Sequence, residues 1–174
     1  MMRRVMVVGQ PGSGKSTFAR RLGEATDLPV VHIDRIHWLP GWVERDRVEK
    51  IAMIRAEEAR DRWIIEGGLS ATYASRAARA DTIVHLDASV WRRLWCVTKR
   101  LALGYGRTRP DMQDGCPERL GRQTPEFYRY IWRTRHSGRD RILAMLADAG
   151  SGKSVHRLGS FAEADAFIAR ARLA

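Results

Sequence analysis

A glycine-rich octapeptide near the N-terminus constrains this chain more than any other feature. It lies between an apolar run and a run of helix-forming residues, and it reads Gly9-Gln10-Pro11-Gly12-Ser13-Gly14-Lys15-Ser16. Glycines at these positions let the backbone curl so that its N–H groups surround an anion, and the start of a helix adds partial positive charge. The flanking runs predict a strand over 4–9 and a helix over 16–25. This strand–loop–helix order is the context that a phosphate-binding loop requires.

Two side chains of the octapeptide complete the predicted nucleotide site. We expect Lys15 to reach the outer phosphates of ATP and the Ser16 hydroxyl to bind Mg²⁺. Lysine is rare in this chain, which has four lysines among its 31 basic residues. Its presence at position 15 favours this role, because a compact ammonium suits phosphates there. ATP and Mg²⁺ are therefore the expected cofactors, and the expected cofactor-binding residues are Gly9, Gly12, Ser13, Gly14, Lys15, Ser16 and Thr17.

Apolar runs and helical patterns alternate along the rest of the chain. Further strands are expected at 30–33, 63–66, 82–86 and 155–158, and helices at about 44–60, from Ser89 to 103, and after Ser160. Thr124-Pro125 is expected to open one long helix, because proline favours the first turn. Ser160 and Glu163 have the spacing of a capping box. The order predicts an α/β fold of three layers, with a five-stranded parallel sheet and helices on both faces.

Length and composition limit the class of protein. The 174 residues suit a single domain, 1–174, with a small lid over about 104–123. No apolar run approaches the roughly 18 residues that a membrane span needs. The N-terminal residues lead into a core strand without a signal-peptide pattern, so we expect a cytoplasmic location and no membrane partner. The oligomeric state is left open. Cys96, in an apolar helical stretch, is expected to be buried, and Cys116, in a polar loop, to be exposed.

The positive charge is concentrated in one segment. The net charge is +11, and residues 92–141 hold twelve arginines and one lysine against five acidic residues. Such a cluster indicates an anionic ligand, although for any single arginine a solvated helix face is the simpler interpretation. Phosphoryl transfer relies on neutralising the transferred group, so a lid that carries arginines is expected to close over a triphosphate. The candidate catalytic arginines are Arg100, Arg107, Arg109, Arg133 and Arg135.

Candidate acceptor-binding residues follow the second and third predicted strands. Asp34 is expected across a cleft from Lys15, where a carboxylate would orient the acceptor or support the magnesium shell; the alternative is a helix cap. Residues 66–68 (Glu66, Gly67 and Gly68) are expected to face the same cleft. Trp38 and Trp42 would stack on the acceptor, or they pack as part of a mobile segment.

Several motifs outside the octapeptide carry a resemblance to a known group. They are His32-Ile33-Asp34 with Trp38, Pro40-Gly41-Trp42, Trp63-Ile64-Ile65-Glu66-Gly67-Gly68, and Thr108-Arg109-Pro110-Asp111-Met112 with Gly115-Cys116-Pro117-Glu118. With these motifs the chain resembles the P-loop kinases of the adenylate kinase and shikimate kinase type. Within them it resembles the small bacterial group labelled "DNA topology modulation protein, FlaR-related". The resemblance implies a nucleoside-phosphate kinase architecture. The chain departs from the group at Glu66 and Gly68, in a stretch that more often begins Asp-Gly-Asn-Tyr in the group.

Three classes of function follow. The first is an ATP- and Mg²⁺-dependent kinase whose acceptor is a nucleotide or another small hydroxylated or anionic metabolite. The second is a nucleic-acid-associated ATPase or regulator that affects DNA topology, suggested by the charge and the group label. Because no nucleic-acid-binding motif is apparent, we expect any such binding to be weak and non-specific. The third is a GTP-dependent switch, and it is the weakest because the sequence has no Asn-Lys-x-Asp motif to read the base.

Overall fold

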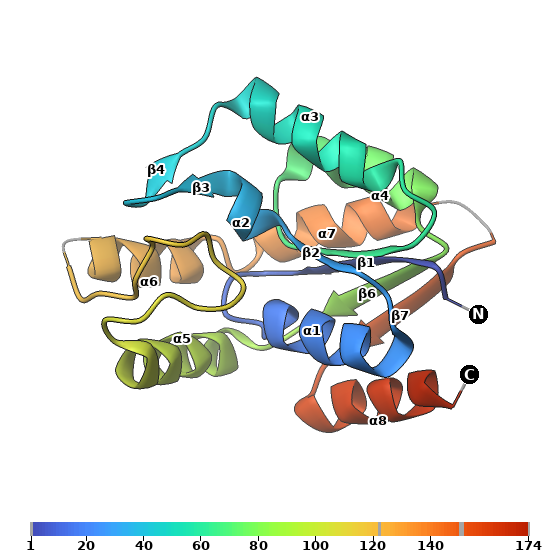
Figure 1. Cartoon of the computed structure of the whole chain (residues 1–174). Helices are drawn as coiled ribbons and strands as arrows, with labels where there is room; N and C mark the ends of the chain where they lie inside the picture. Colours follow the sequence, from blue (N-terminus) through green and yellow to red (C-terminus); the bar gives the residue numbers. More distant parts are fainter. Residues whose placement is uncertain (1, 122, 150–151, 174) are drawn as a thin grey trace.

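A parallel five-stranded sheet forms the centre of the molecule. The computed structural model describes residues 2–121, 123–149 and 152–173. The sheet has the order β2-β5-β1-β6-β7 and every pairing in it is parallel. Its strands are β1 (Arg4–Gly9), β2 (Val30–His32), β5 (Trp63–Glu66), β6 (Thr82–Leu86) and β7 (Ser154–Leu158). Figure 1 shows the strands running away from the two termini. The predicted α/β class is confirmed.

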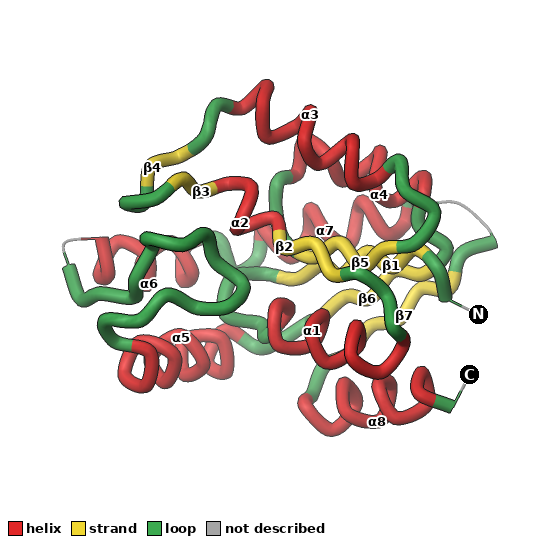
Figure 2. Tube along the Cα trace, in the orientation of Figure 1, coloured by secondary structure: helices red, strands yellow, loops and turns green. Residues whose placement is uncertain are grey.

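Helices cover both faces of the sheet, as Figure 2 shows. The helices are α1 (Lys15–Thr26), α2 (Ile33–His37), α3 (Arg47–Glu58), α4 (Tyr73–Arg79), α5 (Val90–Gly104), α6 (Gln123–Arg133), α7 (Ser137–Ala147) and α8 (Phe161–Arg172), with a 3-10 turn at Ser70–Thr72. Helices α1 and α8 pack together on one face, and α3, α4 and α7 lie on the other.

Alternation along β1 builds the two halves of the core. Val5 and Val7 point toward α1 and α8, whereas Met6 and Val8 point toward α2, α4 and α7, and all four are fully buried. Side chains of a strand alternate between faces, so a strand covered on both sides is apolar at every position. This explains why an unbroken apolar run of the sequence became the central strand.

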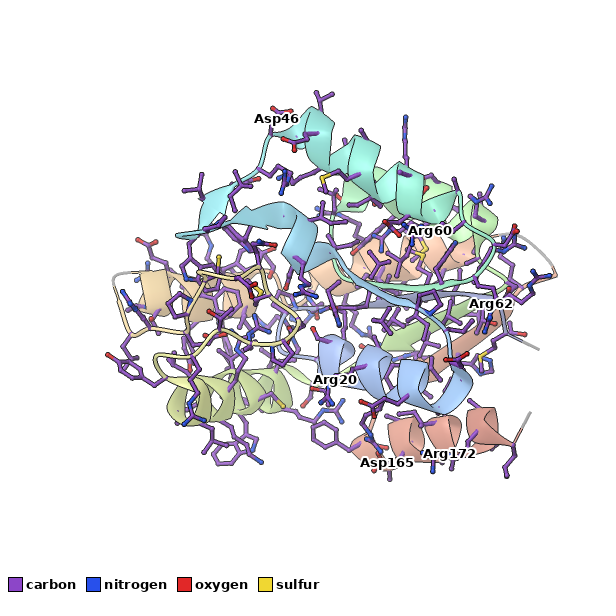
Figure 3. The ribbon with its side chains drawn as sticks, viewed as in Figure 1. Arg20, Asp46, Arg60, Arg62, Asp165 and Arg172 are labelled. Atoms are coloured by element: carbon purple, nitrogen blue, oxygen red, sulfur yellow. The ribbon has the colours of Figure 1, made fainter. Side chains whose placement is uncertain are left out.

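The segment between β2 and α3 differs from the prediction. Ile33, expected to end a strand, begins the short helix α2. Two short strands, β3 (Trp38–Leu39) and β4 (Val43–Glu44), form an antiparallel hairpin in a segment where no strand was expected, and β4 takes up Glu44, the expected start of the next helix. Helix α3 starts only at Arg47, because the Asp46 carboxylate caps it by accepting the N–H groups of Val48 and Glu49 (Figure 3).

The long helix predicted after Pro125 is two helices. Helix α6 ends at Arg133 and α7 begins at Ser137. The break contains the Thr134 carbonyl, which accepts a hydrogen bond from Gln10 Nε2 at 2.8 Å. The side chain of Gln10 also approaches Gly138 so closely that a Cβ there would lie 2.7 Å from Gln10 Nε2. A contact from a distant loop therefore sets this break, and the local sequence gives no sign of it.

Apolar length along the helices is limited. Across residues 2–121, 123–149 and 152–173, no helix is both long enough and apolar enough to cross a bilayer.

The capping box at Ser160 gives a test of local stability. The Ser160 hydroxyl accepts the N–H of Glu163, whose carboxylate accepts the N–H of Gly159. We expect Ser160→Ala to lower the free energy of unfolding by about 1 kcal/mol, the usual value of an N-cap. Urea unfolding measures it, with Ser154→Ala, an exposed side chain in β7, as the control. Equal losses in both variants would contradict a capping role.

Candidate active site

The carboxyl ends of β1, β2 and β5 open into one large cleft. Parallel strands place these ends at the same edge of the sheet, which is where ligands bind in folds of this type. The cleft has a volume of about 1580 Å³. The predicted residues that line it are Gly9, Gly12, Ser13, Gly14, Lys15, Ser16, Thr17, Asp34, Trp38, Trp42, Gly67, Gly68, Arg100 and Arg109. The structure thus brings the predicted cofactor residues and most predicted acceptor residues to a single cavity.

The glycine-rich loop, residues 9–16, forms a curled backbone at the floor of the cleft. The N–H of Ser13 donates to the carbonyl of Gln10 at 3.1 Å, and Lys15 Nζ donates to the same carbonyl at 3.1 Å. Gly12 has a φ of 79°, and a Cβ on it would lie 2.6 Å from the carbonyl oxygen of Arg93. The buried Ser13 hydroxyl has no hydrogen-bond partner among the described residues. A tight loop with an unpartnered polar atom fits an anionic ligand.

Arg93, which the sequence analysis did not single out, holds this loop from behind. Its Nε donates to the Pro11 carbonyl at 2.9 Å and its Nη1 to Gln10 Oε1 at 2.8 Å. Only 1% of Arg93 is exposed. Through Gln10 and the Thr134 carbonyl, the same network connects α5, the glycine-rich loop and the α6–α7 break. The sequence offered one sign, a glutamine inside the octapeptide.

Lys15 and Asp34 line the same cleft and lie close enough for each to alter the pKa of the other. Burial lowers the pKa of the Lys15 ammonium, although Glu66 and Asp34 oppose this change. Burial raises the pKa of the Asp34 carboxyl, and Glu66 raises it further, while Lys15 and Arg109 act in the opposite direction. Asp34 belongs to the first turn of α2 but accepts no capping bond there. Its carboxylate is therefore available to the cleft.

Glu66 lies beneath the cleft and is not part of its wall. It is 1% exposed, and its Oε1 is 2.7 Å from His32 Nδ1. Any direct contact of Glu66 with a substrate stays a prediction. Its negative charge acts on Lys15 and Asp34 through the protein interior.

Two predicted arginines lie together above the loop, and each has an acidic neighbour. Glu118 Oε1 is 3.1 Å from Arg100 Nε and 2.7 Å from Arg109 Nε, as ion pairs that lack hydrogen-bond alignment. Arg109 Nη1 also donates to the Asp111 carboxylate. Arg100, Arg109, Asp111 and Glu118 all line the cleft. The two acids belong to the resemblance motif but were counted in the prediction only as negative charges.

The other predicted arginines do not line the cleft. Arg107 is exposed; its backbone N–H donates to the Gly104 carbonyl, and its carbonyl accepts the N–H of Glu118. Arg133 is exposed, and Arg135 stacks over Trp132 with 4.6 Å between the guanidinium carbon and the ring centroid. Catalytic roles for these three stay predictions.

Residues 105–121, the described part of the loop between α5 and α6, pack against the β3–β4 hairpin (Figure 1). Gly41 N–H donates to the Gly115 carbonyl at 2.9 Å, and Trp42 Nε1 donates to the Pro117 carbonyl at 3.1 Å. Cys116 is fully buried, and its Sγ donates to the Leu39 carbonyl at 3.3 Å. The expected lid is therefore docked on the hairpin, although Arg122, within the predicted range, lies outside the described residues.

This docking corrects the prediction for the cysteines. Cys116, expected to be exposed, is buried because a polar loop packs on a distant hairpin. Cys96, expected to be buried, is partly exposed and lines the cleft.

In the described part of the chain, no three His, Cys, Asp or Glu residues form a group that could hold a metal ion.

A second wall of the cleft lies beyond the glycine-rich loop, on the side of α5 and α8. Arg92 Nη1 donates to the Gly159 carbonyl at 2.6 Å, and the Arg92 guanidinium stacks on the Phe161 ring. Phe161 Cε1 would be 3.9 Å from a Cβ on Gly14. Asp34 of α2, Trp38 of β3 and the 67–68 turn line the same cleft, and Figure 1 shows α2 and β3 on the opposite side of α1 from α8. The cleft thus has two ends, and the glycine-rich loop lies between them.

The turn after β5 is held by a buried arginine. Arg76 is fully buried, and it donates to the carbonyls of Gly68 at 2.6 Å and Gly67 at 3.3 Å and to the Thr72 hydroxyl at 3.1 Å. Gly67 has a φ of 125°, and a Cβ on it would lie 2.8 Å from the Cβ of Ile33. Burial lowers the pKa of Arg76 to about 10. This contact pattern fixes the turn beside Asp34.

Comparison with known proteins shows the fold. No family model matches the chain, and no curated protein matches its sequence. Shikimate kinase from Acinetobacter baumannii, solved with shikimate, is 16% identical, with 99% of this chain and 93% of that chain covered and a TM-score of 0.59. A sugar kinase from a Janibacter species is 18% identical, with coverage of 98% and 92% and a TM-score of 0.53. Deoxyadenosine kinase from M. mycoides, with bound dCTP, is 10% identical, with coverage of 98% and 99% and a TM-score of 0.52.

These three solved structures are kinases, and their likeness confirms the predicted α/β fold with a five-stranded parallel sheet and helices on both faces. The narrower resemblance to the FlaR-related group is not confirmed by these comparisons and stays a prediction.

The buried Arg76 gives a test of the 67–68 turn. Arg76→Met leaves two buried acceptors, the Gly67 carbonyl and the Thr72 hydroxyl, and the part-buried Gly68 carbonyl without this donor. This loss outweighs the relief of removing a buried charge, so the free energy of unfolding should fall by about 2 kcal/mol. Arg79→Met, on the same helix, is the control, because Arg79 binds only the carbonyls of Glu58 and Ala59, away from the cleft. Urea unfolding compares the two. A smaller loss for Arg76→Met than for Arg79→Met would contradict the role of Arg76 in holding the turn.

Proposed function

We propose that the protein is an ATP- and Mg²⁺-dependent kinase that transfers the γ-phosphoryl group to a small acceptor. One observation carries the proposal: Lys15, from the glycine-rich loop after β1, and Asp34, from the end of β2, converge on the same cleft. A cation for the donor phosphates and a carboxylate for the acceptor are the two groups that phosphoryl transfer needs on opposite sides of the reacting phosphorus. The fold shared with solved kinases supports the proposal.

The glycine-rich loop fits a triphosphate. Its N–H groups and the N-terminus of α1 would bind the phosphates, and Lys15 would leave the Gln10 carbonyl to bind the outer ones. Ser16 would contribute its hydroxyl to Mg²⁺, which takes few protein ligands because phosphates and water complete its octahedral shell. The ion neutralises phosphate charge when bound. Asp34, which interacts electrostatically with Lys15, would support that shell by accepting hydrogen bonds from water bound to the ion.

The two ends of the cleft suit different parts of the substrates. Arg92 and Phe161 offer a cation and an aromatic face on the α5–α8 side, a suitable surface for the base of the donor nucleotide. Trp38 and Trp42, with 5.5 Å between ring centroids, line the opposite end with Tyr73, where they would contact the acceptor. Arg100 and Arg109 lie between these ends and would neutralise charge on the transferred group.

Asp34 would act on the acceptor. Its raised pKa, caused by burial and by Glu66, brings the carboxyl closer to the working range of a general base. The docked loop 105–121 covers this end of the cleft, which would limit access of water as a competing acceptor.

The donor site is tested at Lys15. Lys15→Ala should lose most of its affinity for a fluorescent ATP analogue with Mg²⁺ while keeping its far-UV circular dichroism, because the ammonium is lost and the fold is not. Removal of one such positioned charge costs about 3 kcal/mol, roughly a hundredfold. Lys153→Ala is a matched control, since Lys153 lies in a similar Gly-Lys-Ser sequence but binds the carbonyls of Ala78 and Ala80. Equal nucleotide affinity in wild type and Lys15→Ala would contradict the proposed function.

The acceptor side is tested at Asp34. Asp34→Asn should keep nucleotide binding and lose phosphoryl transfer by roughly a hundredfold, the usual scale for a general base. In the wild type, transfer should fall on acidification, and the fall should begin above the usual aspartate range because the pKa of Asp34 is raised. Coupled-assay rates of ADP formation over pH measure both effects. Unchanged turnover in Asp34→Asn would assign Asp34 to a structural role.

A further inference from the structure

The acceptor end of the cleft is rich in carboxylates. Glu66 and Asp111 both raise the pKa of Asp34, so the three acids lie within electrostatic range of one another. Asp34, Asp111 and Glu118 all oppose the lowering of the Arg100 pKa that burial causes. Asp34 thus shares the acceptor end of the cleft with further acids, and the positive charges that oppose them at Asp34 are Lys15 and Arg109.

The cations near this position already have partners. Arg109 is paired with both Asp111 and Glu118, and Arg100 shares Glu118 with it. In the proposed function, Lys15 binds the phosphates of the donor nucleotide. Arg141 also lines the cleft as an exposed side chain of α7, and its charge opposes the rise in the pKa of Tyr73 that burial causes. It is not among the main charges that act on Asp34. Lys99 and Arg119 line the cleft as exposed side chains too, and neither is among the main charges that act on Asp34. The cations that do act on Asp34 are Lys15, assigned to the donor, and Arg109, which is paired with two acids.

This charge arrangement separates two kinds of acceptor. A phosphate monoester carries up to two negative charges, and its reacting oxygen would approach Asp34, Asp111 and Glu66, where like charges repel. A phosphate oxygen also needs no base, because it is already ionised. An alcohol is neutral on approach and must lose its proton to a group such as Asp34 as the bond to phosphorus forms.

We propose that the acceptor of this site is an uncharged hydroxyl group and not a phosphate monoester, an inference that rests on the proposed kinase function. The hydroxyl oxygen forms a bond to the γ-phosphorus of ATP while the bond from that phosphorus to the β–γ bridging oxygen breaks. The hydroxyl proton passes to Asp34, and ADP leaves with the bridging oxygen. The products are a phosphate monoester and ADP, and the step needs no other reactant.

Matched pairs of acceptors test this assignment with the full-length chain. Nucleosides are compared with their 5′-monophosphates, and hexoses with their 6-phosphates, by ADP formation above the background without acceptor. We expect the best hydroxyl compound to exceed its phosphorylated partner at least tenfold, about 1.4 kcal/mol. A monophosphate that is used as well as its hydroxyl partner, or better, overturns the inference and leaves the kinase function intact. Failure of every pair, together with equal ATP binding by wild type and Lys15→Ala, contradicts the kinase function as well. Failure of every pair despite Lys15-dependent ATP binding overturns the inference alone.

Removal of one acid tests the physical cause. Asp111→Asn should reduce the preference for hydroxyl compounds over monophosphates several-fold, because it removes negative charge from the acceptor end. Asp114→Asn, an exposed residue of the same loop that does not line the cleft, should leave the preference unchanged. Binding of the fluorescent ATP analogue shows that each variant is folded. An unchanged preference in a folded Asp111→Asn variant would overturn the electrostatic explanation.

Discussion

Arg93 fixes the shape of the glycine-rich loop, and much of the cleft depends on that contact. The guanidinium binds the Pro11 carbonyl and Gln10 Oε1, while the Arg93 carbonyl leaves no room for a Cβ at Gly12. Gln10 then binds the Thr134 carbonyl, so α5 and the α6–α7 break are tied to the same loop. Glycines make a loop permissive, and a permissive loop needs outside contacts to hold one conformation. Here these contacts come from a buried arginine, whose desolvation lowers its pKa.

Local patterns predicted the parts of the fold that depend on local chemistry. The mainly apolar runs at 63–66 and 82–86 became β5 and β6 with the predicted bounds, because strands buried on both faces are apolar at most positions. From the parallel strand order alone, the glycine-rich loop and Asp34 could be predicted to lie at the same edge of the sheet, although their side-chain contacts could not. The hairpin of Trp38 and Glu44 escaped prediction, because two-residue strands carry almost no periodicity.

Contacts between distant segments account for the remaining errors. Cys116 occupies a polar loop, and only the docking of that loop on Leu39 buries it. The break before α7 follows from Gln10, more than a hundred residues earlier in the chain. Glu118 is an ordinary loop acid in the sequence, and its importance comes from lying between Arg100 and Arg109. Charge counts predicted an anion-binding segment, but they gave no information on which arginines are already paired.

The docked loop also limits how the cleft can open. Trp42 binds the Pro117 carbonyl, Gly41 binds the Gly115 carbonyl, and Asp111 and Glu118 of the same loop hold Arg109. Separation of loop from hairpin would break the Trp42 and Gly41 bonds and expose buried Cys116, whereas joint movement of the two segments would keep them; the Arg109 pairs lie within the loop and stay intact in both cases. Joint movement is therefore the less costly route for substrate entry. Arg109 and the Trp38–Trp42 wall would then move together, so the same motion that admits an acceptor would also withdraw charge from the transferred group.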